Sequence, residues 1–77
     1  MYFNTDIPSK VITLSINGAS RAFSAVLNIA ELVEQLGYTG KRIALERNGE
    51  IVPRSTYAHV QLAEGDKLEI VVAVGGG

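Results

Sequence analysis

The sequence predicts one small α+β domain in which a single helix covers one face of a sheet. Segment 10–16 alternates apolar and polar residues, and segment 67–74 begins with the same alternation before it becomes apolar, which indicates two strands. Only segment 29–36 has apolar residues at helical spacing. A chain of 77 residues holds one domain and no second core. Because one helix must cover the whole sheet, we expect a two-layer arrangement.

The composition is that of a globular protein, with 47% hydrophobic and 19% charged residues. The formal net charge is −1 and no basic run occurs, so nucleic acid is a poor candidate partner. The longest uncharged apolar stretch, 70–74, is too short to span a bilayer. With no Cys and one His, a disulfide is excluded and a metal site is disfavoured. Since the first residues do not resemble a signal peptide, the expected location is the cytoplasm.

The N-terminal part predicts an extension followed by a hairpin. Residues 1–9 are mixed and turn-prone, and we interpret them as an extension outside the domain. The strand over 10–16 runs into Asn17-Gly18, the strongest short-range hairpin signal. Residues 21–24 then form the return strand.

The helix is the best specified element. Asn28 can cap it, and Glu31 lies three residues later, where it completes a capping box. Gly37 follows the last apolar position and favours the left-handed conformation that ends a helix. Start, apolar face and stop therefore agree on a helix over 29–36.

Three further strands are predicted after the helix. They cover 41–47, 51–53 and 67–74; the first two flank Asn48-Gly49, and a turn at 64–66 precedes the last. Residues 55–60 are expected to be irregular or to form one helical turn, with Tyr57 and Leu62 in the core beneath this connection. Arg47 falls where an apolar residue would alternate, so we expect its guanidinium in water at the sheet margin.

The last strand has two different faces. Leu68, Ile70, Val72 and Val74 share one face, which we expect to be buried. The other face begins with Glu69 and becomes apolar at Val71 and Ala73. Such a strand is usually central or exposes an apolar patch, so Val71 and Ala73 are candidate partner contacts.

The sequence ends in three glycines, Gly75, Gly76 and Gly77. Glycine lacks a Cβ, so a glycine tail is thin enough to enter a narrow channel of another protein. We expect residues 75–77 to be a flexible tail beyond a domain over 10–74. The alternative is an ordinary frayed terminus.

Two polar residues are weaker candidates. Arg54 could contact an acidic partner or an adenylate phosphate, or it could stabilise its own turn. His59 has no neighbouring Cys or Ser motif, so we expect it in a surface or partly packed loop. No nucleophile–base pair or phosphate-binding loop is evident, and the chain is not expected to be an enzyme.

The chain resembles the ThiS/MoaD family of ubiquitin-like sulfur carriers over roughly residues 10–77. The resemblance rests on the two Asn-Gly turns, the helix end at 34–37, the Asn-Gly-Glu-Ile-Val-Pro-Arg-Ser segment at 48–55, Glu64-Gly65-Asp66 and the terminal glycines. It implies a ubiquitin-like β-grasp fold, a mixed sheet of four to five strands packed on one helix. The Val72-Ala73-Val74 approach to the glycines favours the ThiS branch over MoaD, which usually has a Pro-Pro-Val type approach.

The resemblance also implies the chemistry. The carboxylate of Gly77 would be adenylated by a ThiF-like enzyme that uses ATP and Mg, while the carrier itself binds no cofactor. Sulfur from cysteine, mobilised by a desulfurase, would then give a thiocarboxylate, with Gly75 and Gly76 threading into the partners. A ThiG-like thiazole synthase would take the sulfur for thiamin biosynthesis. A MoaD-like carrier, a ubiquitin-like protein modifier and a plain binding module remain the alternatives.

Overall fold

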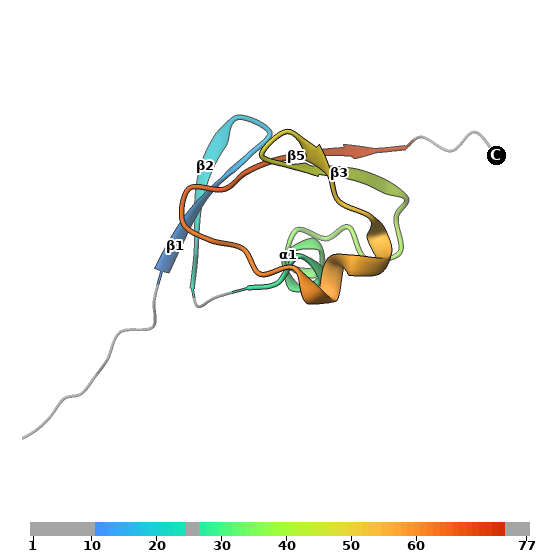
Figure 1. Cartoon of the computed structure of the whole chain (residues 1–77), viewed down its shortest axis with the longest axis horizontal. Coiled ribbons are helices and arrows are strands. Elements are labelled where there is room, and N and C mark those ends of the chain that lie inside the picture. Colours follow the sequence, from blue (N-terminus) through green and yellow to red (C-terminus); the bar gives the residue numbers. More distant parts are fainter. Residues whose placement is uncertain (1–10, 25–26, 74–77) are drawn as a thin grey trace, which may run out of the picture.

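The computed structural model describes residues 11–24 and 27–73 (Figure 1). Within these ranges the chain forms five strands, one α-helix and one 3-10 helix. Their order is β1 (Val11–Ile16), β2 (Ala19–Ser24), α1 (Ile29–Gln35), β3 (Ile43–Arg47), β4 (Glu50–Ile51), η1 (Arg54–His59) and β5 (Lys67–Val72). The predicted extension, 1–9, and tail, 75–77, lie outside the described residues.

The strands form one mixed sheet in the order β2-β1-β5-β3-β4. β5 is parallel to β1 and antiparallel to β3, whereas both hairpins are antiparallel. The last strand of the chain is therefore the central strand, as its apolar character predicts. This mixed sheet with one α-helix confirms the predicted β-grasp fold.

The core lies between α1 and one face of the sheet. Alternate residues of the central strands point into it, and Leu14, Leu45 and Leu68 are each 1% exposed. Ile29 and Leu32 on α1 are fully buried against them. The other buried apolar residues are Ile12, Ile16, Phe23, Leu27, Tyr57, Leu62 and Ile70, which confirms the prediction for Tyr57 and Leu62. Burial on one face leaves the opposite face of the sheet open.

Local sequence signals account for the connections. The Asn28 side chain accepts from the Glu31 amide at 2.8 Å, and the Glu31 side chain accepts from the Asn28 amide at 3.0 Å, so the predicted capping box is present. Gly37, at a φ of +85°, follows the end of the helix. The Tyr38 amide donates to the Val33 carbonyl, which completes a Schellman ending. No helix of the described residues is long and apolar enough to cross a membrane.

The bounds of four predicted strands differ. β2 starts at Ala19 instead of residue 21, and β3 starts at Ile43 instead of residue 41. β4 covers Glu50–Ile51 instead of 51–53, and β5 ends at Val72 instead of residue 74. Val72 was expected on the buried face but is 38% exposed. Among the described residues, its only strand neighbour is Ile43 of β3, because the pairing of β1 with β5 stops at Leu68. With a strand on one side only, Val72 keeps part of its side chain in solvent.

The prediction for Arg47 was wrong. Its side chain is 31% exposed and its Nε lies 2.9 Å from Oδ2 of Asp66, with which it forms an ion pair. Asp66 is buried, with an exposed fraction of 7%. A buried carboxylate without a charged partner would cost much free energy. Arg47 therefore lies against Asp66 instead of extending into water.

Candidate functional site

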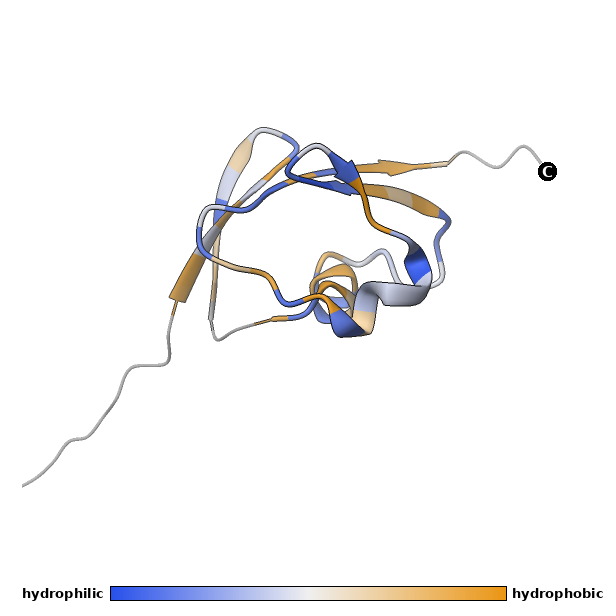
Figure 2. Ribbon diagram, in the orientation of Figure 1, coloured by the Kyte–Doolittle hydropathy of each residue, from blue (hydrophilic) through white to orange (hydrophobic). Residues whose placement is uncertain are grey.

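The candidate site is the end of β5, where the chain leaves the sheet. Val71 is 64% exposed and Ala73 is exposed, both on the face opposite α1. Val71 lies directly across from Ala44 of β3, which is also exposed. Figure 2 shows that the second half of β5 is hydrophobic, whereas the strand begins among hydrophilic residues. The predicted apolar surface is therefore present beside the exit of the chain.

Basic residues border this exit. The Ala73 amide donates to the Arg42 carbonyl at 2.8 Å, which ties the end of β5 to the loop before β3. Nη2 of Arg54 approaches the carbonyl oxygen of the preceding residue, Lys41, at 3.4 Å. Lys41, Arg42 and Arg54 are all exposed. The structure thus brings Arg54 to the same loop as the end of β5, and it adds Lys41 and Arg42, which sequence reasoning did not single out.

Arg54 also has a local role. Burial raises the pKa of the Tyr57 phenol, and the nearby Arg54 guanidinium partly opposes that shift. Both residues belong to η1, whose first residue is Arg54. The Arg54 guanidinium thus acts electrostatically on Tyr57 and donates to the Lys41 carbonyl, which supports a role in its own turn. Contact of Arg54 with a partner stays a prediction. His59, at the other end of η1, is exposed, as predicted.

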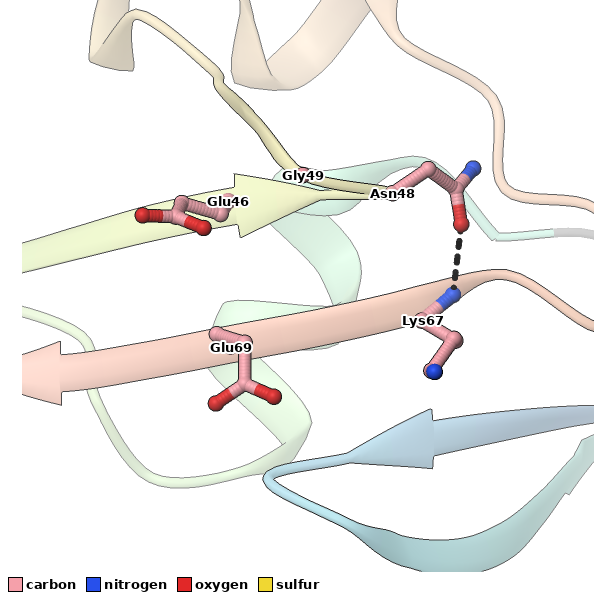
Figure 3. Close-up of a pocket in the computed structure, with 5 residues that line it drawn as sticks. All are labelled: Glu46, Asn48, Gly49, Lys67 and Glu69. Atoms are coloured by element: carbon pink, nitrogen blue, oxygen red, sulfur yellow. Dashed lines mark hydrogen bonds between the residues drawn. The ribbon is translucent and has the colours of Figure 1, made fainter.

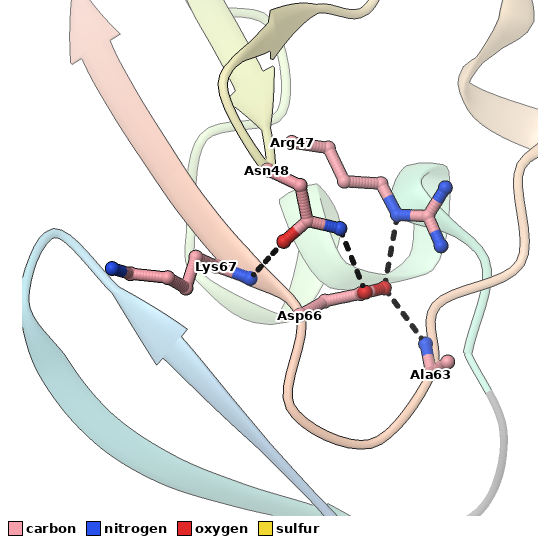
Figure 4. Close-up of polar contacts among 5 residues, drawn as sticks. All are labelled: Arg47, Asn48, Ala63, Asp66 and Lys67. Atoms are coloured by element: carbon pink, nitrogen blue, oxygen red, sulfur yellow. Dashed lines mark hydrogen bonds and ion pairs between the residues drawn. The ribbon is translucent and has the colours of Figure 1, made fainter.

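At its start, β5 is anchored by Asp66 (Figure 4). The two carboxylate oxygens of Asp66 accept from Arg47 Nε, Asn48 Nδ2 and the Ala63 amide at 2.9–3.1 Å. Burial alone would raise the pKa of Asp66, but the hydrogen bonds from Ala63, Asn48 and Arg47, with the Arg47 charge, outweigh it and lower the pKa. Sequence reasoning explained Asp66 as a turn residue and missed this anchoring role.

The two Asn-Gly turns hold β5 from both sides. Asn17 accepts from the Ile70 amide at 2.7 Å and donates to the Ile70 carbonyl at 3.1 Å. On the β3 side, Asn48 Oδ1 accepts from the Lys67 amide at 2.9 Å. Both asparagines have positive φ, which a two-residue hairpin requires. The sequence shows that both turns begin with Asn. It does not show that these side chains bind β5, since Asn17 and Ile70 are more than fifty residues apart in the chain.

A hollow of about 400 Å³ lies on the open face of the sheet, near the start of β5 (Figure 3). Glu46, Asn48, Gly49, Lys67 and Glu69 line it. Glu46 and Glu69 are directly opposite across β3 and β5. The hollow is remote from the exit of the chain, and among the described residues no group of three or more His, Cys, Asp or Glu could hold a metal ion. It brings together none of the predicted contact residues.

The predicted attachment and threading residues, Gly75, Gly76 and Gly77, lie outside the described residues. The described site therefore consists of the strand that leads to them, its exposed face and the basic loop beside its end. Of the predicted contacts, Val71 and Ala73 lie together, and Arg54 is joined to them through the exit loop.

Known proteins are similar to this chain in sequence and in fold. A thiazole synthase of Paramagnetospirillum magneticum is 52% identical over 64 residues, which are 83% of this chain and 20% of that protein. The chain spans about a fifth of the length of the thiazole synthases that it matches. Uncharacterized protein ycf40 of Porphyra purpurea is 33% identical over 69 residues, 90% of this chain and 97% of the relative.

A solved structure gives the same answer for the fold. The crystal structure of the thiamine biosynthesis protein ThiS from Geobacter metallireducens superposes with a TM-score of 0.73 and 28% identity. The superposition covers 86% of this chain and all of that one. The sequence model of the ThiS family matches residues 14–77, most of this chain and including the terminal glycines. On the fold, the family model and these relatives together, the chain belongs to the ThiS family.

Proposed function

We propose that this protein carries sulfur for thiazole formation in thiamin biosynthesis, and that the sulfur is held as a thiocarboxylate on Gly77. Membership of the ThiS family supports this role. So does the likeness to a protein described as a thiamine biosynthesis protein. The structural observation that carries the proposal is the placement of β5: this central, anchored strand ends at Val72, three residues before Gly75 in the sequence, and exposes Val71 near its end.

The chemistry needs an activated terminus. A carboxylate at neutral pH does not accept a nucleophile, so one oxygen of Gly77 would first attack the α-phosphorus of ATP, with pyrophosphate leaving. The terminal sulfur of a persulfide, formed from cysteine by a desulfurase, would then attack the carbonyl carbon and displace AMP, which gives an acyl disulfide. A thiol, such as the excess cysteine, would reduce this disulfide by thiol–disulfide exchange and release the thiocarboxylate. ATP and Mg would be bound by a ThiF-like adenylating enzyme, and the carrier would contribute the substrate carboxylate and no catalytic group.

Gly75 and Gly76 would be the threading residues in this scheme. A side chain at Gly76 adds bulk and restricts the backbone, both of which oppose entry into a narrow channel. Val71, Ala73 and Arg54 would contact the partner around the exit. A small apolar patch with a charged rim suits transient docking, because interface centres are apolar and their edges polar.

The consumer of the sulfur would be a ThiG-like thiazole synthase. The support for this partner is that proteins named thiazole synthase contain a segment similar to this chain. A carrier has to visit the activating enzyme and the synthase in turn, so we expect both to use the same end of β5.

Intact mass spectrometry tests the proposal. The protein is incubated with a ThiF-like enzyme, ATP, Mg, a cysteine desulfurase and cysteine, with an ATP-free control. A mass gain equal to one oxygen-to-sulfur exchange, mapped to Gly77, is expected only with ATP. No gain with an enzyme that is active on its own carrier would contradict the proposal, and isopeptide-linked ladders in cells would point to a protein modifier instead.

The Gly76→Val variant gives the matched test of the tail. We expect it to abolish adenylation, measured by ATP–pyrophosphate exchange, while the urea unfolding curve stays that of the parent protein. Gly76 follows β5 in the sequence, so we expect its role only in the complex. Normal adenylation of this variant would refute the threading role of Gly76.

A further inference from the structure

The side of β5 that faces β1 is paired over only part of its length. β1 pairs with β5 through Lys67 and Leu68. Asn17, the next residue after β1, continues the pattern: its amide donates to the Leu68 carbonyl, and its side chain bonds both polar groups of the Ile70 backbone. The Asn17 side chain thus replaces one further residue of a strand, and the pairing ends there.

Val72 is the next residue whose backbone faces that side. The Ala73 amide donates to Arg42 on the β3 side. Because successive residues of a strand direct their backbone groups to opposite sides, the N–H and C=O of Val72 point away from β3. Within residues 11–24 and 27–73, no hydrogen bond to either group is found. Figure 1 shows β5 continuing past the β1–β2 hairpin with β3 alongside.

Among the described residues, this open edge has none of the usual protection of an edge strand. Natural edge strands are blunted by charged side chains, Pro or a covering element. Here Val71, Val72 and Ala73 are uncharged and exposed to different degrees. Such an edge is suited to pair with the backbone of another chain.

The proposed function places a partner against this edge. Gly77 lies five residues after Val72, and an extended chain spans at most about 3.6 Å per residue, so the two are no more than about 18 Å apart. An active site that receives Gly77 in a channel would therefore have its reacting atoms within about 18 Å of Val72. A backbone N–H and C=O covered by protein without hydrogen-bond partners would be costly. An extended segment of the partner would satisfy both groups at once.

We propose that the enzyme that adenylates this protein adds an extended segment to the β5 edge at Val72, in line with β1 and beyond the Asn17 side chain. This inference rests on the proposed function and names the mode of recognition at the same site. The partner is identified by its chemistry: it presents free backbone donors and acceptors beside its adenylation channel. In this mode of recognition the partner forms hydrogen bonds with the backbone of Val72, so the Val72 side chain contributes less to the affinity.

The Val72→Pro variant tests the proposal against Val72→Thr. Proline removes the N–H and is tolerated where that group faces away from its sheet neighbour. Threonine keeps the N–H and a β-branched shape. We expect Val72→Pro to weaken binding of a purified ThiF-like enzyme, measured by calorimetry, about tenfold or more, and Val72→Thr to change it less than threefold. Equal affinity of both variants would overturn the strand proposal.

Hydrogen exchange of the unmodified protein provides a measurement that does not depend on a variant folding. The Val72 amide should exchange rapidly in the free protein and at least tenfold more slowly in the complex. The Val71 amide, which lies on the β3 side, should be protected in both states. An unprotected Val72 amide in a complex that adenylates Gly77 would overturn the strand proposal and leave the proposed function standing. Absence of adenylation by an active enzyme would overturn both.

Discussion

The two ends of β5 are built differently. At its start, side chains from two parts of the chain hold the strand: Asp66 is bound by Arg47 and Asn48, and Asn48 also accepts from the Lys67 amide. At its end, Ala73 is bound to one neighbouring backbone, and Val71 and Val72 are partly or largely exposed.

This difference shows which end of β5 has its position fixed by side chains. A buried carboxylate is costly unless several donors surround it, and it therefore fixes one arrangement of the strand start. The end of the strand carries no such network within the described residues. The direction of this end is set by the anchored start of β5 and by its backbone pairing with β3. The exposed end then remains available for contact with other proteins.

The largest expected effect is at the anchored start. Asp66→Asn keeps the size of the side chain but replaces one acceptor oxygen by an amide donor. That amide would face the donors of Arg47 and Ala63 at one position, or the donor of Asn48 at the other. We expect the free energy of unfolding to fall by about 2–4 kcal/mol. Urea denaturation at pH 7 measures it. Glu69→Gln, an exposed carboxylate on the same strand, is the control and should change stability by less than about 0.5 kcal/mol.

The pH dependence of the same pair of proteins isolates the charge. The pKa of Asp66 is lower in the folded protein than in the unfolded chain, so its contribution to stability is full above the unfolded value of about 3.9 and is lost as the pH falls through the folded value. The stability difference between the parent and Asp66→Asn should therefore narrow as the pH is lowered below about 4. A difference that stays constant down to pH 2 would mean that the carboxylate charge is not what anchors the strand.

The two Asn-Gly turns give the next effect. Glycine accepts the positive φ of both asparagines, so Asn48→Gly and Asn17→Gly remove the side-chain bonds without straining the turn. We expect losses of about 2 kcal/mol for Asn48→Gly and about 1 kcal/mol for Asn17→Gly, since the Asn48 amide donates to a charged group. Urea denaturation of both variants checks the order. The reverse order would mean that Asn17, on the β1 side, stabilises β5 more than Asn48 does.

Much of this architecture could be predicted from local sequence signals. Asn28, Glu31 and Gly37 act within a few residues of themselves, so the helix and its caps follow from the sequence. Alternation predicts the inner faces of β1 and of β5 as far as Ile70, but not the exposure of Val72. The Arg47–Asp66 pair could not be predicted in this way, because it forms only after β3 and β5 become neighbours. The open edge at Val72 depends on where β1 stops relative to β5, which no local pattern records.

The smallest effect on stability is expected at the end of β5. Val71→Asp places a charge on a side chain that is 64% exposed, and we expect the free energy of unfolding to change by less than about 0.5 kcal/mol. Binding to the adenylating enzyme should nevertheless weaken at least about tenfold, because a carboxylate would be buried without a partner in the docked state. Val71→Thr, which keeps the shape and adds no charge, is the matched control, and calorimetric titration measures both variants. A variant with a large loss of stability would show that the end of β5 supports the fold after all. Unchanged affinity of Val71→Asp would mean that the docking surface does not lie on this face. Weakened binding with unchanged stability would show that one part of β5 stabilises the domain and another part contacts the partner.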